Sequence, residues 1–217
     1  FEGAQDYDFT LRFTEKTKSI GHIPKILYHW RERKESTAIN PEAKGYIVEA
    51  AKKAKTEALE RRGYEAELEW VSNIYQFRVN YKAVGNPKVS IVIPSKDNFE
   101  VYKRCIDTLT GKTLYKNYEI ITVDNGSSDT NRQKYEKYIK EKGQKYIYMP
   151  MEFNFSKMCN IGVENSDGEI ILLLNDDMEI ISGEWMERMV GHALLPYIGA
   201  VGAKLLYPNS TLIQHTG

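Results

Sequence analysis

Apolar and polar positions follow two periodic patterns in the second part of the chain, residues 87–217, one typical of strands and the other typical of helices. Short apolar or β-branched runs predict strands at residues 89–93, 120–123, 146–149 and 170–174. The segments between and after these runs have helical spacing or helix-like composition, at residues 102–109, 129–141, 154–163 and 185–193. Strands that alternate with helices predict βαβ units, and therefore an α/β fold with a mostly parallel sheet flanked by helices over residues 87–217.

The strand predicted at residues 170–174 is apolar at every position, which is typical of a central strand covered on both faces. Three polar residues follow it directly: Asn175, Asp176 and Asp177. Because open α/β sheets bind ligands at the carboxyl ends of their strands, such loops predict a ligand site at one edge of the sheet. Comparable polar loops lie at residues 94–98, 124–129 and 153–156.

Asp176 and Asp177 place two adjacent carboxylates where a strand leads into a loop. Mg²⁺ takes one or two protein carboxylates and completes its shell with water and phosphate oxygens, so this pair is suited to a cation that binds a phosphorylated ligand. Taken alone, the pair is typical of a turn, and Asp129 and Asn154 could be ordinary helix caps. Several polar loops at one edge favour a ligand site. The segment at residues 126–128 lacks the glycine spacing of dinucleotide and P-loop sites, so a nucleotide must be held in another way.

The first part of the chain has a different organisation. Residues 40–42 are typical of a helix start, an apolar stripe follows, and Gly63 is typical of a helix end. Residues 67–81 predict extended segments that lead into the second part of the chain. We therefore expect residues 41–86 to form a helical and extended connector.

Composition narrows the class of protein. Of the 217 residues, 41% are hydrophobic and 28% are charged, which indicates a globular chain. Lys and Arg together number 30, as do Asp and Glu, so the formal net charge is zero and argues against a role in coating nucleic acid. The two cysteines, Cys105 and Cys159, form no CxxC or zinc pattern. No apolar run reaches the roughly 20 residues that span a bilayer.

Five segments at and beside the predicted strand ends carry a family resemblance. They are residues 89–94, 118–127, 154–160, 167–169 and 175–177. In order and spacing they resemble the family 2 inverting glycosyltransferases, which have the GT-A fold, and the resemblance covers about residues 87–217. It implies a metal-dependent enzyme that transfers a sugar from a nucleotide-diphosphate donor to a saccharide hydroxyl with inversion, in the synthesis of bacterial surface polysaccharide.

The resemblance also implies roles for individual residues. Asp124 would read the base of the donor, Asp176 would face its ribose or diphosphate, and Asp177 would bind Mg²⁺ or Mn²⁺. Asn175 stands where many family members carry an acid, so it would be a weaker metal ligand. The metal would neutralise the leaving diphosphate. The other donor-nucleotide-binding residues would be Pro94, Ser95, Asp97, Asn154 and Asn160.

Residues 1–40 resemble the acceptor-side half of the same family, which normally follows the donor half. They predict a helical and strand appendage, with a strand at residues 23–28 that runs into Tyr28-His29-Trp30. Asp6 matches the general base of the family, and His29 would contact the diphosphate or the metal. We therefore expect an internal excerpt of a tandem enzyme. The tail of an upstream glycosyltransferase domain would precede the nucleotide-sugar-binding half of the next, whose sheet would be incomplete at its C-terminal side.

This organisation has consequences for activity and partners. The excerpt alone should be a poor catalyst, and its incomplete sheet could associate with residues 1–40 of the same chain or of a second one. The expected ligands are the sugar donor and a saccharide acceptor, without nucleic acid, and the expected location is the cytoplasm, including the inner face of the membrane. Two alternatives stay open: a non-catalytic module that binds a saccharide or a partner, and a nucleotidyltransferase. The lack of a Gly-rich basic loop after the first strand disfavours the latter.

Overall fold

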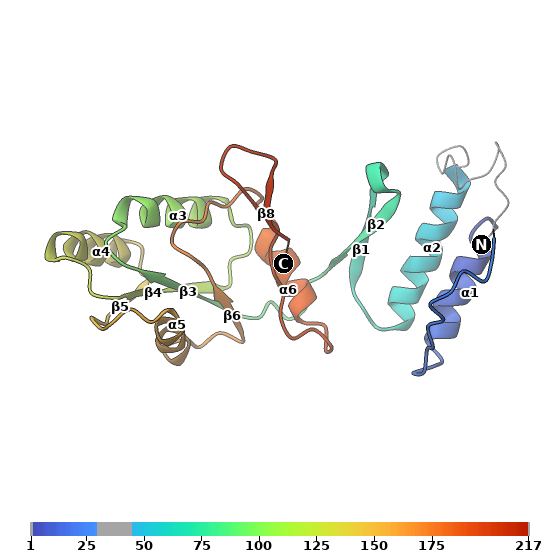
Figure 1. The fold of residues 1–217 in the computed structure, drawn as a ribbon, viewed down its shortest axis with the longest axis horizontal. Coiled ribbons are helices and arrows are strands. Elements are labelled where there is room, and N and C mark those ends of the chain that lie inside the picture. Colours follow the sequence, from blue (N-terminus) through green and yellow to red (C-terminus); the bar gives the residue numbers. More distant parts are fainter. Residues whose placement is uncertain (1, 30–44, 217) are drawn as a thin grey trace. The chain divides into compact units, whose positions relative to one another are not determined.

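The computed structural model describes residues 2–29 and 45–216. The chain divides into two compact units, Phe1–Lys82 and Ala83–Gly217. Figure 1 shows the helices and strands of both units in the colours of the sequence. The predicted helix start at residues 40–42 lies outside the described residues, as does Trp30.

A four-stranded parallel sheet forms the centre of the second unit. Its strands are β3 (Val89–Ser95), β4 (Tyr118–Asp124), β5 (Lys145–Tyr148) and β6 (Ile170–Leu173). They lie in the order β5-β4-β3-β6, and every neighbouring pair is parallel. The prediction of an α/β fold with a mostly parallel sheet is therefore confirmed.

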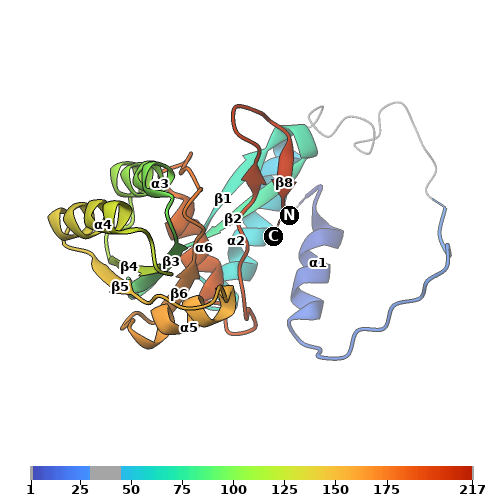
Figure 2. The same ribbon diagram turned by 60° about the vertical axis from the view of Figure 1, so that its left-hand side comes forward.

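Helices cover both faces of this sheet, as Figures 1 and 2 show. They are α3 (Phe99–Lys112), α4 (Asp129–Glu141), α5 (Phe155–Glu164) and α6 (Trp185–Ala193). On one face, Met158 of α5 packs with Val92 and Ile121. On the other face, Ile91 and Ile93 pack against α3, α4 and α6. Successive β3 side chains therefore enter two separate cores, because side chains alternate between the faces of a strand.

The part of the chain that follows β6 adds a cavity and a short hairpin. The cavity has a volume of about 350 Å³ and is lined by β6, by Trp185 and Met189 of α6, and by residues 199–201. The hairpin consists of β7 (Leu205–Leu206) and β8 (Ile213–His215), which pair antiparallel. Over residues 2–29 and 45–216, none of the helices combines the length and the apolar composition needed to cross a bilayer.

β6 lies at one end of the sheet, so the prediction that residues 170–174 form a central strand is wrong. Ile171 and Leu173 are 38% and 52% exposed, whereas Ile170 and Leu172 pack against the core on the other face. An apolar run shows that burial of the strand is favourable, but it does not show which strands or helices cover it. The two interior strands are β3, which pairs with β4 and β6 and is buried at every position, and β4, which pairs with β3 and β5.

Glu119 ties several segments together at the amino end of β4. Its carboxylate accepts hydrogen bonds from the Ser90 hydroxyl at 2.6 Å, from the Lys145 ammonium at 2.8 Å and from the Asp167 N–H at 3.0 Å. Burial opposes ionisation, but the hydrogen bonds from Lys145 and Ser90 outweigh it and lower the pKa of Glu119 below its ordinary value. Folding therefore favours the ionised form of this side chain.

We expect Glu119→Gln to lower the free energy of unfolding at pH 7 by roughly 1.5–3 kcal/mol, the range for hydrogen bonds to charged groups. Because folding depresses the pKa of Glu119, its contribution is complete above the ordinary Glu pKa of about 4.3. The contribution is lost as the pH falls through the lower folded value. Urea denaturation followed by near-UV circular dichroism should therefore show a smaller difference from wild type at about pH 3.5 than at neutral pH. An equal difference at both pH values would contradict the ionic role.

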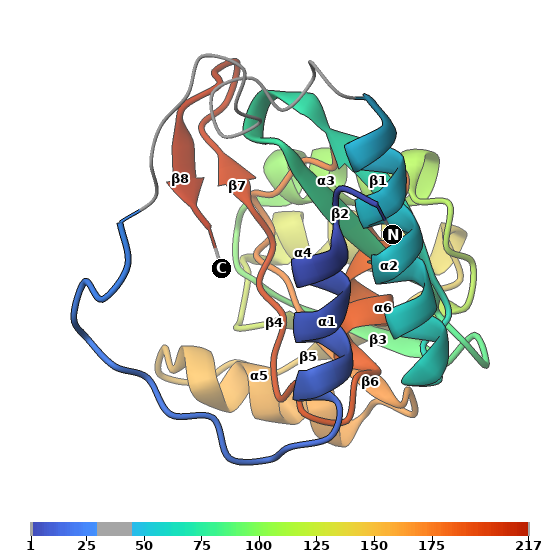
Figure 3. The same cartoon turned by 90° about the vertical axis from the view of Figure 1, so that its right-hand side faces the viewer.

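The first unit combines a helix pair with a β-hairpin. Helix α1 (Gln5–Thr14) packs on α2 (Gly45–Arg61), and the two lie side by side in Figure 3. Strands β1 (Ala66–Val71) and β2 (Gln76–Tyr81) pair antiparallel across a turn at Ser72–Ile74, so the extended segments predicted at residues 67–81 are present.

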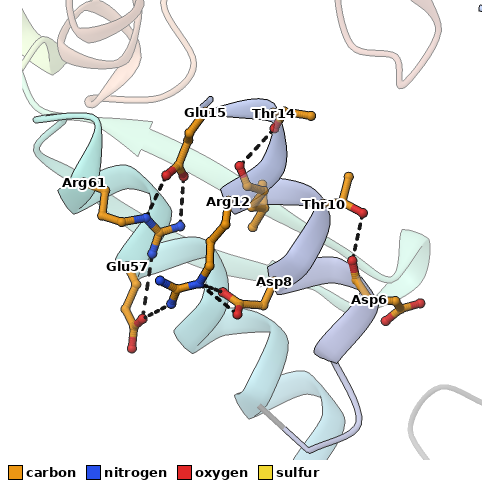
Figure 4. A network of polar contacts seen from close by, with 9 residues as sticks. Asp6, Asp8, Thr10, Arg12, Thr14, Glu15, Glu57 and Arg61 are labelled. Carbon is orange, nitrogen blue, oxygen red and sulfur yellow. Dashed lines mark hydrogen bonds and ion pairs between the residues drawn. The ribbon is translucent and has the colours of Figure 1, made fainter. Parts of the chain in front are cut away.

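Charged contacts join α1 to α2, as Figure 4 shows. Arg12 lies 3.0 Å from the Glu57 carboxylate, and Arg61 lies 2.8 Å from the Glu15 carboxylate. Arg12 also pairs with Asp8 on its own helix. Ion pairs that remain accessible to water each contribute little to the free energy of folding. These contacts therefore orient α1 on α2 more than they stabilise the two helices.

Residues 17–29 contain no strand, so the strand predicted at residues 23–28 is wrong. The side chains of Ile23, Ile26 and Leu27 are 62%, 83% and 69% exposed. A strand requires a neighbour whose N–H and C=O groups complete the ladder, and an apolar pattern does not by itself supply that neighbour.

Candidate functional site

The carboxyl ends of β3, β4 and β6 bring several predicted site residues together. Ser95 and Asp124, the last residues of β3 and β4, are direct neighbours in the parallel register. Asp176 follows shortly after Leu173, where β6 ends. The Ser95 hydroxyl donates to Oδ2 of Asp176 at 2.6 Å, so the loops after β3 and β6 meet in a direct contact.

Pro94 helps to separate the loop at residues 175–177 from the sheet. The β3–β6 register ends at the pair Val92 and Leu173, and the last ladder bond runs from the Leu174 N–H to the Val92 carbonyl at 3.0 Å. Pro94 has no N–H and cannot extend this ladder. The chain after Leu174 therefore leaves the sheet and turns at the two aspartates.

The two adjacent aspartates have different environments. Asp176 is half-buried, and burial raises its pKa; the Ser95 hydrogen bond opposes that rise, and the negative charge of Asp177 adds to it. The Asn98 side chain also lowers the pKa of Asp176. Asp177, in contrast, is exposed. One carboxylate is therefore held by the protein, and the next one is accessible to a ligand.

This pair fits the hard cation predicted from the sequence. Mg²⁺ and Mn²⁺ prefer oxygen ligands, and Mg²⁺ is held by one or two carboxylates with substrate phosphates and water completing the shell. The described ranges hold no group of three or more His, Cys, Asp or Glu side chains that could bind a metal by themselves. Asn175 is exposed, and its backbone carbonyl accepts from the Cys105 thiol at 3.7 Å. A cation here would depend on oxygens from its ligand.

Asp97 connects the loop after β3 to the first turn of α4. Its backbone has a φ of 50°, in the left-handed region that Asp and Asn tolerate better than most residues. Its Oδ1 accepts from the Ser128 N–H at 2.9 Å, from the Ser128 hydroxyl at 2.8 Å and from the Asn131 amide at 2.9 Å. These hydrogen bonds, that of Asn131 first, lower the pKa of Asp97. An anion at this position also suits the positive end of the helix.

Asp124 is fully buried, and both of its oxygens have partners within the fold. Oδ1 accepts from the Ser127 N–H at 2.8 Å and closes the turn that includes Gly126, whose φ is 79°. Oδ2 accepts from the Tyr146 hydroxyl at 2.5 Å. Burial and this carboxylate raise the pKa of Tyr146. Asp124 therefore shapes the loop after β4, in addition to any contact with a ligand.

Asn125, the next residue, has a buried amide that the sequence analysis did not single out. Its side chain is 1% exposed, and neither the amide oxygen nor the amide nitrogen has a hydrogen-bond partner among the described residues. Its backbone N–H donates to the Ser95 carbonyl at 3.1 Å, which places it beside the Ser95–Asp176 contact. Buried side-chain amides rarely lack a hydrogen-bond partner, so we expect a ligand or a water molecule to be the partner of Asn125.

Asn154 and Asn160 belong to the segment of α5. Asn154 is the N-cap of the helix, and its side chain accepts from the Lys157 N–H at 2.9 Å. Asn160 lies within the helix and is exposed. The capping role of Asn154 was one of the two readings that the sequence left open, and a ligand role for either residue stays a prediction.

Asp6 and His29 belong to the first unit, and Asp177 belongs to the second. Asp6 is exposed on α1, and its Oδ1 accepts from the Tyr7 N–H at 2.9 Å. Its backbone carbonyl accepts from the Thr10 hydroxyl at 2.8 Å, as Figure 4 shows. His29 is exposed in a segment without helix or strand. The general-base role of Asp6 and the metal role of His29 stay predictions.

Several residues that shape the site were missed by the sequence analysis. Tyr135 and Tyr138 lie on the buried side of α4, which was predicted as a helix at residues 129–141 without a buried face. The spacing of Tyr135, Tyr138 and Ile139 is the signal that could have revealed a buried face. Asn98 lies in the polar loop predicted at residues 94–98. The contact of Asn98 with Tyr135 and that of Tyr146 with Asp124 had no signal in the sequence, because the partners lie 37 and 22 residues away.

Comparison with known proteins identifies the family. Residues 90–215 match the sequence profile described as glycosyl transferase family 2. Over its whole length the chain is 38% identical to the protein y4gI of Sinorhizobium fredii and 36% identical to the O-antigen biosynthesis protein RfbC of Myxococcus xanthus. It spans 24% and 17% of the lengths of these two relatives.

A solved structure agrees in fold. The mannosyltransferase PcManGT from Pyrobaculum calidifontis, solved in complex with GDP-Man and Mn²⁺, superposes with a TM-score of 0.50 at 15% identity. The match covers 54% of this chain and 35% of that one. At this identity the likeness supports the fold alone, and it agrees with the GT-A type expected from the sequence. The profile match covers more than half of the chain, so the protein belongs to glycosyl transferase family 2.

Proposed function

We propose that the second unit binds a nucleotide-diphosphate sugar at the carboxyl ends of β3, β4 and β6, and that the protein takes part in transferring this sugar to a saccharide hydroxyl with inversion. The observation that carries the proposal is the 2.6 Å hydrogen bond between Ser95 and Asp176, which joins two of the loops in a member of family 2. A site that is already assembled requires less reorganisation when the donor binds.

The donor nucleotide would lie along the loops after β3 and β4. Asp97 and Asp124 would stand on its base side, where their own hydrogen bonds hold both loops in position. The Asn125 amide, which has no partner among the described residues, offers an NH₂ group with two donors and an acceptor oxygen at the same edge. Asp176 would face the ribose or diphosphate. The remaining residues proposed to contact the donor are Pro94, Ser95, Asn154 and Asn160.

Asp177 would hold the divalent cation together with oxygens of the diphosphate, and Asn175 would be a weaker ligand. His29 would contact a diphosphate or a metal in the domain to which residues 1–40 belong. Bound there, Mg²⁺ or Mn²⁺ would offset the negative charge of the leaving diphosphate. The Pyrobaculum mannosyltransferase, solved with Mn²⁺ and GDP-Man, supports a cation of this class.

The acceptor is proposed to be a growing saccharide of a bacterial surface polysaccharide. The Myxococcus relative, an O-antigen biosynthesis protein, supports this class of product. The site is proposed to work in the cytoplasm or at the inner face of the membrane. Asp6 would act as general base for the domain to which residues 1–40 belong.

Calorimetric titration with UDP, dTDP and GDP, each with and without Mn²⁺, tests the donor site. We expect one of these nucleotides to bind in the presence of Mn²⁺ and to lose at least about tenfold in affinity when the metal is chelated or when Asp177 is replaced with Asn. Glu179→Gln is the matched control, because Glu179 is an exposed acid two residues away that pairs with Arg104.

The outcomes separate the two parts of the proposal. Binding that is unaffected by chelation and by Asp177→Asn would contradict the metal role. Absence of binding by all three nucleotides, with the chain folded, would contradict the donor site itself. Equal losses in Asp177→Asn and Glu179→Gln would indicate a general effect of charge instead of a metal ligand.

A further inference from the structure

A buried tyrosine lies directly behind the Ser95–Asp176 contact. Tyr135 of α4 is 0% exposed, and its hydroxyl lies 2.7 Å from the Ser95 hydroxyl. The Asn98 N–H donates to the same tyrosine oxygen at 3.2 Å. These atoms form a continuous chain from the backbone of Asn98 through Tyr135 and Ser95 to Oδ2 of Asp176.

The hydrogen bonds of this chain have only one consistent direction. A carboxylate can only accept hydrogen bonds, so the single hydroxyl proton of Ser95 is donated to Asp176. The Ser95 oxygen must then accept from Tyr135, whose own oxygen accepts from the Asn98 N–H. Hydrogen bonds that point the same way along a chain strengthen one another, and the low dielectric of a buried site adds to this effect.

The same helix is held to the loop after β3 at a second point. Asp97 accepts from Ser128 and Asn131 at the first turn of α4, and Tyr135 contacts Ser95 and Asn98 about one turn further along. The Tyr135 ring is fixed in turn by its neighbours, including Phe99 at 5.4 Å and Tyr146 at 6.3 Å between ring centroids. Helix α4 therefore holds Asp97 directly and Asp176 indirectly, through Tyr135 and Ser95.

We propose that Tyr135 is a positioning residue of the donor site, which acts through Ser95 to orient the carboxylate of Asp176. This inference rests on the proposed function, because it assigns Asp176 to the donor. Tyr135 itself is buried and is not assigned a contact with the ligand. Its hydroxyl fixes the rotation of the Ser95 hydroxyl, and this rotation decides where one oxygen of Asp176 is held.

The structure offers a matched control for this idea. Tyr102 of α3 is also 0% exposed and lies next to Tyr135, with ring centroids 5.0 Å apart. Its hydroxyl pairs with Thr122 of β4 at 2.7 Å and does not belong to the chain that ends at Asp176. Tyr102→Phe and Tyr135→Phe thus remove the same group from the same core, and only the second change interrupts the path to the site.

The test compares nucleotide binding with stability. We expect Tyr135→Phe to weaken binding of the nucleoside diphosphate with Mn²⁺ by roughly three- to tenfold, the ratio expected when one hydrogen bond is lost. Tyr102→Phe should change this affinity by less than about twofold even if both variants unfold at a similarly lower urea concentration. In a Ser95→Ala background, Tyr135→Phe should cause no further loss, because its path to Asp176 is already interrupted.

A second readout does not depend on the donor. The ¹³C chemical shift of the Asp176 carboxylate, assigned by its absence in Asp176→Asn, should move in Tyr135→Phe and stay unchanged in Tyr102→Phe at one fixed pH without ligand. If no nucleotide binds to wild type, the proposed function fails while this shift still decides the positioning role. An unchanged shift in Tyr135→Phe, equal effects of the two phenylalanine variants, or a full additional loss in the Ser95→Ala background would each overturn the inference.

Discussion

Replacing Asp124 with alanine is expected to lower the free energy of unfolding by roughly 2–6 kcal/mol, because two donors, one buried and one half-buried, lose their acceptor at roughly 1–3 kcal/mol each. These donors are the Ser127 N–H and the Tyr146 hydroxyl. The turn that follows β4 should open when they are released. Nucleotide binding should then weaken by about tenfold or more. Urea denaturation and calorimetric titration of the same preparation measure the two effects.

Asp124→Asn separates the role of Asp124 in holding the loop from the role of its negative charge in nucleotide binding. The amide keeps one acceptor for the Ser127 N–H and has nearly the same size, so the loss of stability should be much smaller than in the alanine variant. If Asp124 reads the base through its charge, nucleotide binding should still fall in Asp124→Asn. Retained binding in Asp124→Asn would restrict the residue to a structural role, and unchanged stability in Asp124→Ala would contradict the loop argument.

Gly162→Ala is expected to destabilise the second unit strongly. A Cβ atom at Gly162 of α5 would lie 2.2 Å from Cγ1 and 3.0 Å from Cγ2 of Val92, far inside van der Waals contact. Val92 is fully buried in β3, an interior strand of the sheet, so the helix or the strand must move. Overpacking of this kind costs roughly 1–3 kcal/mol and more where the backbone cannot yield. Urea denaturation should show a lower midpoint with an unchanged slope.

Two further variants give this prediction its controls. Gly111→Ala in α3 adds the same methyl group where nothing lies within 4 Å, so it should be neutral or should stabilise by up to about 1 kcal/mol. Val92→Ala removes the side chain that causes the clash. The double variant Gly162→Ala/Val92→Ala should therefore be more stable than the sum of the two single effects predicts. A Gly162→Ala variant as stable as Gly111→Ala would rule out the close approach of α5 to β3.

The sequence was a good guide to the elements of the second unit and to their chemistry. The apolar runs at residues 89–93 and 120–123 lie within β3 and β4, and the helix with the spacing of Tyr102 and Leu109 is α3. Both patterns report local backbone geometry, which repeats every two residues in strands and about every 3.6 residues in helices. The loops with Ser95 and Asp176 could be placed at one edge because parallel strands end on the same side.

The sequence was a poor guide wherever the answer depended on a neighbour. Residues 170–174 are apolar throughout, and residues 23–28 are largely apolar but include Pro24 and Lys25; the first run contains an edge strand and the second contains none. The first run pairs with β3, whereas no strand among the described residues completes a hydrogen-bond ladder with the second.

By itself, the sequence determined the α/β class, the family and the set of strand-end residues, because these follow from local periodicity and from motifs that are contiguous in the chain. Only the tertiary structure decided how those residues are held. It placed the hydroxyl of Tyr135, 40 residues from Ser95, within hydrogen-bond distance, and it joined Ser95 to Asp176 across 81 residues. It also buried both oxygens of Asp124 and left the Asn125 amide without a partner among the described residues. Contacts between such distant positions depend on how helices pack on the sheet, and no local pattern in the sequence records that packing.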